Sequence, residues 1–176
     1  MPYLVAGVVF VGVLCAFDLI LTVAVVRRLR VHAALLEGER SLPPLTPPGT
    51  RLPEFHGDGV DGATVTRAFF SGPTIVGLFS TTCGSCRERL PEFAGRLRAL
   101  GDRRALAVVV GEDRDAAEPF VADLSPVATV VVEPEGGPVS AAFGYPAYPS
   151  FYIVNADAEV TASTLTLDGL PVPASK

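Results

Sequence analysis

The sequence of 176 residues contains no tryptophan, two histidines and three cysteines. Its net charge of −5 at pH 7 does not indicate the positively charged surface that binds nucleic acids, which argues against such a function. We also find no internal repeat, no glycine-rich phosphate loop and no nucleotide-binding motif. Three cysteines with one close pair do not form the disulfide framework of a small secreted domain. The length suits one globular domain of moderate size, and its chemistry must come from the remaining motifs.

The most informative stretch is an apolar run that leads directly into a Cys-Gly-Ser-Cys motif. Residues 74–79 are rich in β-branched side chains without polar alternation, which is typical of a strand covered on both faces. Apolar side chains then recur at helical spacing, at Leu90, Phe93, Ala94, Leu97 and Leu100. We therefore predict a helix capped by Thr81 or Thr82, with Cys83 at its N-terminus and Cys86 about one turn inside.

This position favours a reactive thiol at Cys83. Unpaired backbone N–H groups and the positive end of the helix macrodipole stabilise a thiolate, and Arg87 and Arg89 add positive charge nearby. Cys86 can attack any mixed disulfide that Cys83 makes, which releases the product and closes a Cys83–Cys86 disulfide. The pair is interpreted as a catalytic dithiol/disulfide couple, which requires no other cofactor and no metal.

Two alternatives for the cysteine pair are half of a zinc site and a pair of inert structural thiols. A tetrahedral zinc site needs two further ligands, and the candidates Cys15, His32 and His56 are far apart in the sequence. Inert thiols are not expected at the start of a helix. The prediction therefore includes no metal ligand.

Further short elements are expected on both sides of the motif. The predicted strands are Leu52–Phe55, Ala63–Val65, Ala105–Gly111, Ala128–Val132, Ser150–Val154 and Glu159–Ser163, and the predicted helices are Ala116–Leu124 and Pro138–Phe143. The last two strands bracket an Asn-Ala-Asp-Ala turn, which indicates a hairpin. The order of elements around the cysteine helix is that of a βαβ unit.

Four motifs in order carry a family resemblance: Pro53-Glu54-Phe55, the strand running into Cys-Gly-Ser-Cys, Leu90-Pro91, and the segment 148–155. Over about residues 49–166 the chain resembles the membrane-anchored TlpA-type thiol:disulfide oxidoreductases. Within that group it is similar to the thioredoxin-like accessory proteins of methylamine utilisation. The resemblance implies an α/β fold of the thioredoxin-like (redoxin/TlpA) type.

The resemblance also implies a reaction and a substrate groove. Such an enzyme reduces or exchanges disulfides in partner proteins, and it needs protein thiol/disulfide substrates and an upstream electron donor or acceptor. In the family the proline before the late strand is cis and faces the cysteines, which carries over to Pro149. We expect Tyr148 and Pro149 to bind substrate together with Thr82, which stands where many relatives have tryptophan.

Departures from the family pattern keep two other functions open. The strand 74–79 offers no buried acid to handle the proton of Cys86, and no closing helix is expected after Thr166. One alternative is a thiol peroxidase of the redoxin superfamily, which would use Thr81, Thr82 and Arg87 around the reactive thiol. The other is a non-enzymatic thioredoxin-fold binding module.

The N-terminal region predicts a membrane anchor. Residues 3–26 form a nearly continuous apolar run with Asp18 as the only charge, long enough for one transmembrane helix. The start Met1-Pro2 and the arginines that follow the run do not fit a cleavable signal peptide. We therefore expect an uncleaved single-pass anchor over residues 1–28.

The remaining chain divides into a juxtamembrane and proline-rich linker at 29–53, a thioredoxin-like domain at 54–170 and a tail at 171–176. Five prolines within Ser41–Pro53 predict a stiff, extended spacer. For the side of the membrane, two arguments conflict. Arg27, Arg28 and Arg30 place the domain in the cytoplasm by the positive-inside rule, whereas the family resemblance favours the extracytoplasmic side.

Overall fold

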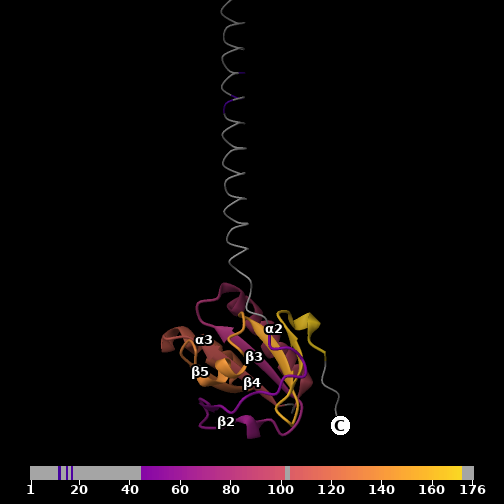
Figure 1. Cartoon of the computed structure of the whole chain (residues 1–176). Coiled ribbons are helices and arrows are strands. Elements are labelled where there is room, and N and C mark those ends of the chain that lie inside the picture. Colours follow the sequence, from indigo (N-terminus) through magenta and orange to yellow (C-terminus); the bar gives the residue numbers. More distant parts are fainter. Residues whose placement is uncertain (1–11, 13–14, 16, 18–44, 102–103, 172–176) are drawn as a thin grey trace, which may run out of the picture. The chain divides into compact units, whose positions relative to one another are not determined.

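The structure is a computed structural model that describes residues 12, 15, 17, 45–101 and 104–171 (Figure 1). The chain separates into two compact units, Met1–Ser41 and Leu42–Lys176, and the fold below is that of the second. Among the described residues, no helix is long and apolar enough to cross a membrane. The predicted anchor lies almost entirely outside the described residues, as do residues 29–44 of the predicted linker and residues 172–176 of the predicted tail.

A five-stranded mixed sheet forms the centre of the domain, with strand order β5-β4-β3-β6-β7. The strands are β3 (Thr74–Ser80), β4 (Ala105–Val110), β5 (Thr129–Glu133), β6 (Ser150–Val154) and β7 (Val160–Thr164). The strands β3, β4 and β5 are parallel, whereas β6 runs antiparallel to β3 and β7 antiparallel to β6. The central position of β3 explains why its sequence is apolar without alternation, since both of its faces are buried.

Helices and a small sheet cover the two faces of the large sheet. The helices are α2 (Gly84–Leu100), α3 (Arg114–Leu124) and α4 (Pro138–Ala142), with 3-10 turns at Arg67–Phe69 and Leu167–Gly169. The small antiparallel sheet consists of β1 (His56–Asp58) and β2 (Thr64–Thr66). Apolar side chains of α2 and α3 fill one core, and those of α4, β2 and the segment before β1 fill the other. The predicted α/β thioredoxin-like architecture is present.

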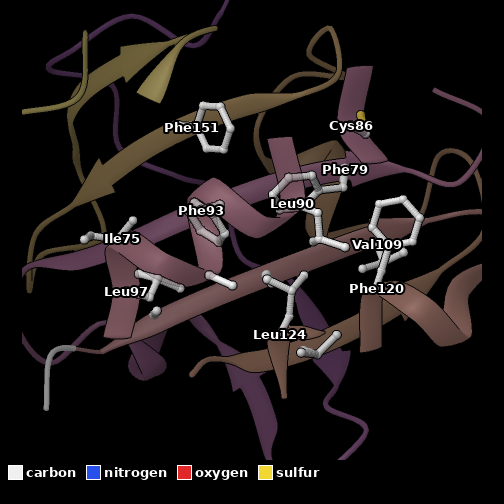
Figure 2. Close-up of a cluster of buried hydrophobic side chains, with 14 of the residues drawn as sticks. Ile75, Phe79, Cys86, Leu90, Phe93, Leu97, Val109, Phe120, Leu124 and Phe151 are labelled. Atoms are coloured by element: carbon white, nitrogen blue, oxygen red, sulfur yellow. The ribbon is translucent and has the colours of Figure 1, made fainter. Parts of the chain in front are cut away.

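The core between the sheet and α2 is built around aromatic rings (Figure 2). The Phe79 ring centroid lies 5.3 Å from that of Phe93 and 5.9 Å from that of Phe151. Gly77 makes this arrangement possible, because a Cβ atom there would lie 2.7 Å from Cζ of Phe93. Cys86 is fully buried at one end of the same cluster. The aromatic core therefore supports the helix turn that carries the second cysteine.

The predicted strand Leu52–Phe55 is wrong, since the first strand begins at His56. Leu52 and Phe55 are buried, and the Leu52 N–H donates to the carbonyl of Ala158 beside an isolated antiparallel bridge between Arg51 and Glu159. Their apolar pattern reflects burial in the second core. The other predicted elements are present with boundaries shifted by one or two residues, and Ser150–Val154 agrees in full.

Residues 45–53 lie against the domain instead of extending as a spacer. The Thr46 hydroxyl donates to the carbonyl of Phe143 over 2.6 Å, and the Gly49 N–H donates to that of Val160 over 2.8 Å. Leu52 is 1% exposed. These contacts tie the end of the predicted linker to the loop after α4 and to the start of β7.

The flank beside α2, for which no closing helix was expected, is covered by the C-terminal 3-10 turn. Leu167 and Leu170 are buried in the aromatic core. The Arg96 guanidinium donates to the carbonyl of Leu167 over 2.7 Å and to that of Leu170 over 2.5 Å. One arginine of the cysteine helix therefore holds the last described turn of the chain in place.

Candidate active site

The cysteine motif lies where the central strand β3 turns into α2. The Thr81 N–H donates to the carbonyl of Val110 over 2.9 Å, which holds the turn against β4. The helix cap is Cys83 itself, whose Sγ accepts the N–H of Cys86 over 3.3 Å. The predicted threonine cap is wrong, because Thr81 packs against Gly111 and the Thr82 hydroxyl contacts that of Ser80 at 3.0 Å.

Cys83 is partly exposed, and three neighbours surround its sulfur. The Ser85 Oγ lies 3.0 Å away, the N–H of Cys86 donates to the sulfur, and the carbonyl of Tyr148 accepts from the thiol over 3.5 Å. Partial burial raises the pKa of Cys83, but hydrogen bonds from the side chains and backbone of Cys86 and Ser85 outweigh it and lower the pKa below that of an ordinary cysteine. The thiolate of Cys83 is therefore favoured.

The cause of this pKa shift differs in part from the prediction. The N–H groups at the helix start act on the sulfur as predicted, whereas the charges of Arg87 and Arg89 are not among the causes. Arg89 instead approaches Glu92 of the same helix at 3.5 Å. Ser85, the third residue of the motif, was not singled out from the sequence, although a hydroxyl two residues after a cap cysteine is a visible signal.

Cys86 has the opposite character. It is fully buried, and its Sγ accepts the N–H of Ser80 over 3.4 Å. Burial raises the pKa of Cys86 far above the ordinary value, and its hydrogen bond to Cys83 raises it further. One thiol of the pair is thus partly exposed with a lowered pKa, and the other is buried with a raised pKa. Both cysteines are free in this structure.

The turn before β6 completes the site. The Tyr148–Pro149 peptide bond is cis, as the resemblance implied, and Tyr148 lies against Cys83 through its carbonyl. The structure thus brings Cys83, Cys86, Tyr148 and Pro149 to one edge of the sheet. Thr82 is exposed in the turn beside Cys83.

A buried carboxylate, Glu133 at the end of β5, was also missed by the sequence reasoning. It is 6% exposed, and it accepts the N–H groups of Val139 and Ser140 over 3.0 and 2.6 Å. Gly137 is required here, because a Cβ atom there would lie 2.4 Å from the Glu133 carboxyl carbon. The signal was available, since an acid shortly before a proline at the first turn of a helix is a helix-start pattern.

Burial raises the pKa of Tyr148, and the charges of Glu133 and Glu135 raise it further, while the nearby Ser140 hydroxyl opposes the shift. The phenol of Tyr148 is therefore neutral, and it lies within reach of the negative charges of Glu133 and Glu135. Within the described part of the chain, no group of three or more histidine, cysteine or acidic side chains is placed to hold a metal ion.

Comparisons with known proteins agree with this fold. The family described as the AhpC/TSA family matches residues 48–163. A search of curated proteins found no match.

Among solved structures, the chain is similar to the thioredoxin domain of a thiol-disulfide oxidoreductase from Bacteroides vulgatus. The TM-score is 0.59 at 16% identity over 70% of this chain and 91% of that one. It is also similar to a putative thiol:disulfide interchange protein DsbE from Chlorobium tepidum, with a TM-score of 0.54 at 20% identity over 68% and 85% of the two chains.

A secreted disulfide oxidoreductase of Mycobacterium tuberculosis, homologous to Escherichia coli DsbE, gives a TM-score of 0.54 at 18% identity over 69% and 87% of the two chains. Similarity at this level of identity shows the thioredoxin-like fold.

Proposed function

The chain belongs to the AhpC/TSA family, and from this premise we propose that it is a thiol:disulfide oxidoreductase acting on protein thiols and disulfides through Cys83 and Cys86. The observation that supports this most directly is the asymmetry of the pair. Cys83 is partly exposed with a lowered pKa, and Cys86 is buried with a raised one. An attacking thiol must ionise and be reached, whereas a resolving thiol must wait until a mixed disulfide has formed.

In the reductive direction, the Cys83 thiolate attacks one sulfur of a substrate disulfide. The substrate S–S bond breaks, a Cys83–substrate bond forms, and the departing substrate sulfur takes up a proton. Cys86 then loses its proton and attacks Cys83, which releases the second substrate thiol and leaves a Cys83–Cys86 disulfide. Two electrons have passed to the substrate, and an upstream donor returns them; the opposite direction uses an acceptor.

The groove residues have defined roles in this proposal. The Tyr148–Pro149 turn forms the wall against which substrate backbone lies, next to the sulfur of Cys83. Thr82 is exposed in the turn immediately before Cys83, and in this proposal it contacts the substrate chain. In the opposite direction, in which a second substrate thiol breaks the mixed disulfide and Cys83 leaves as a thiolate, hydrogen bonds from the Cys86 N–H and from Ser85 stabilise that thiolate.

Trapping tests the assignment of the two thiols. The substitution Cys86→Ser removes the escape route and leaves Cys83 with its backbone donors, so mixed disulfides with partner proteins should accumulate. Cys83→Ser should trap none and serves as the control. Adducts that form only when Cys83 is absent would reverse the two roles, and no adducts from either variant would favour the binding module.

We further propose that the protein is a TlpA-type oxidoreductase held at the cell membrane by a single-pass anchor within residues 1–28, similar to the methylamine-utilisation accessory proteins. The apolar run supports the anchor. The basic cluster after it supports a cytoplasmic domain, and the family resemblance supports an extracytoplasmic one. Carbonate washing of membranes tests the anchor, and labelling of reduced Cys83 by an impermeant thiol reagent on intact cells identifies the side.

The peroxidase alternative is weaker at this site. Such an enzyme would need an arginine and a hydroxyl arranged around the reactive thiol. Ser85 supplies a hydroxyl at 3.0 Å, but the neighbours of the Cys83 sulfur in the described structure are Ser85, Cys86 and Tyr148, without an arginine. Peroxide consumption by the reduced protein would distinguish the two activities.

A further inference from the structure

An exposed tyrosine with a strained backbone lies three residues before Tyr148. Tyr145 has φ of 53°, in the left-handed region that bulky side chains rarely adopt, and it is 59% exposed. Its neighbours are anchored, because Phe143 is fully buried and its carbonyl accepts the hydroxyl of Thr46. Pro146 and Ala147 are buried on the other side. The fold thus holds an aromatic ring out into solvent on a fixed stretch of backbone, and such strain is typical of functional positions.

The loop that carries Tyr145 lies at the catalytic edge of the sheet. The strands β3, β4 and β5 are parallel and β6 runs against β3, so the loop after β5 and the loop before β6 meet at the edge where Cys83 lies. Three peptide steps separate Tyr145 from Tyr148, so their Cα atoms are at most about 11 Å apart. The Tyr148 carbonyl in turn lies 3.5 Å from the sulfur of Cys83. A polypeptide bound through its cysteine reaches the ring within three or four residues.

The loop beside the ring contains an acidic residue, Glu135. A Cβ atom at Gly136 would lie 3.9 Å from Cε1 of Tyr145, so the ring is close to the loop that contains Glu135. Glu135 is exposed, and the buried Glu133 is held by backbone N–H groups instead of by a cation. Burial is the main cause of the raised pKa of Tyr148, and the charges of Glu133 and Glu135 add to it. This part of the fold therefore places an aromatic face near two negatively charged side chains.

From this placement, and resting on the oxidoreductase function proposed above, we propose that Tyr145 and Glu135 form a subsite that binds a basic side chain, preferably arginine, three or four residues from the reactive cysteine of the polypeptide substrate. A guanidinium stacks on a tyrosine ring and pairs with a carboxylate at the same time. The subsite selects substrates by charge, whereas Cys83 and the cis-proline turn bind any disulfide-bearing chain.

Single-turnover reduction of peptide disulfides by the reduced protein tests this subsite. The peptides differ only in carrying arginine, glutamine or glutamate three residues from the cysteine, on one side or the other. We expect the arginine peptide to react about tenfold faster than the glutamate peptide, from the sum of a cation–π contact and an exposed ion pair. Added salt should reduce this ratio.

Substitutions of Tyr145 and Glu135 test whether these two residues produce the preference for the arginine peptide. Tyr145→Asn keeps a residue that tolerates positive φ and removes the ring, and Glu135→Gln removes the charge. Each should lower the arginine-to-glutamate ratio about threefold. Tyr145→Phe and Glu135→Asp should retain the ratio. So should Asp157→Asn, which removes an exposed carboxylate from the β6–β7 turn at the opposite edge of the sheet.

Equal rates for the arginine and glutamate peptides, or a ratio that Tyr145→Asn leaves unchanged, would overturn the subsite while leaving the oxidoreductase function intact. If the reduced protein reduces none of the peptides, the proposed function fails and the subsite fails with it.

Discussion

The chemistry of the site depends on which atoms lie within hydrogen-bonding distance of one sulfur. Cys83 is the cap of its own helix, so its sulfur accepts a backbone N–H that a threonine cap would otherwise have taken. The same turn places the hydroxyl of Ser85 against it. Cys86 contacts the N–H of Ser80 from inside the core. Two cysteines three positions apart therefore acquire opposite acid–base behaviour from burial and donors.

The first prediction concerns these two residues and states how the alkylation of each cysteine depends on pH. Cys83 should react with iodoacetamide at pH values below those required by an ordinary cysteine, because its lowered pKa leaves more thiolate as the pH falls. Cys86 should not react in the folded protein. Ser85→Ala should move the Cys83 profile to higher pH, since one donor to the thiolate is lost.

The matched control for this measurement is Ser125→Ala, which removes an exposed hydroxyl just after α3 and should leave the profile unchanged. If Ser85→Ala also left the profile unchanged, the hydroxyl would have no part in stabilising the thiolate. The backbone donor of Cys86 would then be the main cause.

Among the elements, α2 and β3 are joined by close packing as well as by sequence. The aromatic rings of Phe79, Phe93 and Phe151 meet over Gly77, which lets the helix approach the strand closely. Pro91 lies inside α2 without ending it. Packing of the buried face therefore outweighs the cost of a proline in this helix.

Two glycine substitutions test the close approach of α2 to β3. Gly77→Ala should destabilise the domain by about 1–3 kcal/mol, because the new methyl group overlaps Phe93 and Phe79. Gly95→Ala on the exposed face of α2 meets nothing within 4 Å and should stabilise by up to about 1 kcal/mol. Chemical denaturation measures both. Equal effects of the two substitutions would contradict the packing account.

For the molecule as a whole, segments far apart in the sequence close the domain around the sheet. Residues 45–53 pair with the start of β7 and the loop after α4, and the turn Leu167–Gly169 packs against α2. Arg96 links that turn to the cysteine helix through two carbonyls. The flank beside α2 is therefore covered within the chain.

The third prediction concerns this link. Arg96→Ala should lower the free energy of unfolding by about 1.5–3 kcal/mol, because two carbonyls lose a charged donor. Arg98→Ala, two positions along the helix and exposed, is the control and should change it by no more than about 0.5 kcal/mol. Proteolysis within the C-terminal turn should increase for Arg96→Ala alone. Equal losses in both variants would indicate a general effect of helix charge.

Several features could be predicted from local sequence alone. The unbroken apolar run of β3 and the helical spacing after it are repeated local patterns, and they identified the strand, the helix and the place of Cys83 and Cys86. The Asn-Ala-Asp-Ala turn predicted the hairpin of β6 and β7 because its signal lies within a few residues. The cis bond at Pro149 came from the family resemblance instead.

The tertiary structure alone decided which distant groups meet. Leu52 and Phe55 look like a strand because burial in a core and pairing in a sheet produce the same apolar pattern. Beyond a helix start, the sequence around Glu133 does not indicate a special role for it. Its role appears only in the folded chain, where the start of α4 donates two N–H groups to its carboxylate. Tyr145 gains its strained, exposed position from anchors on both sides. Sequence periodicity reports a residue's own exposure, whereas these contacts depend on where separate elements are placed by packing.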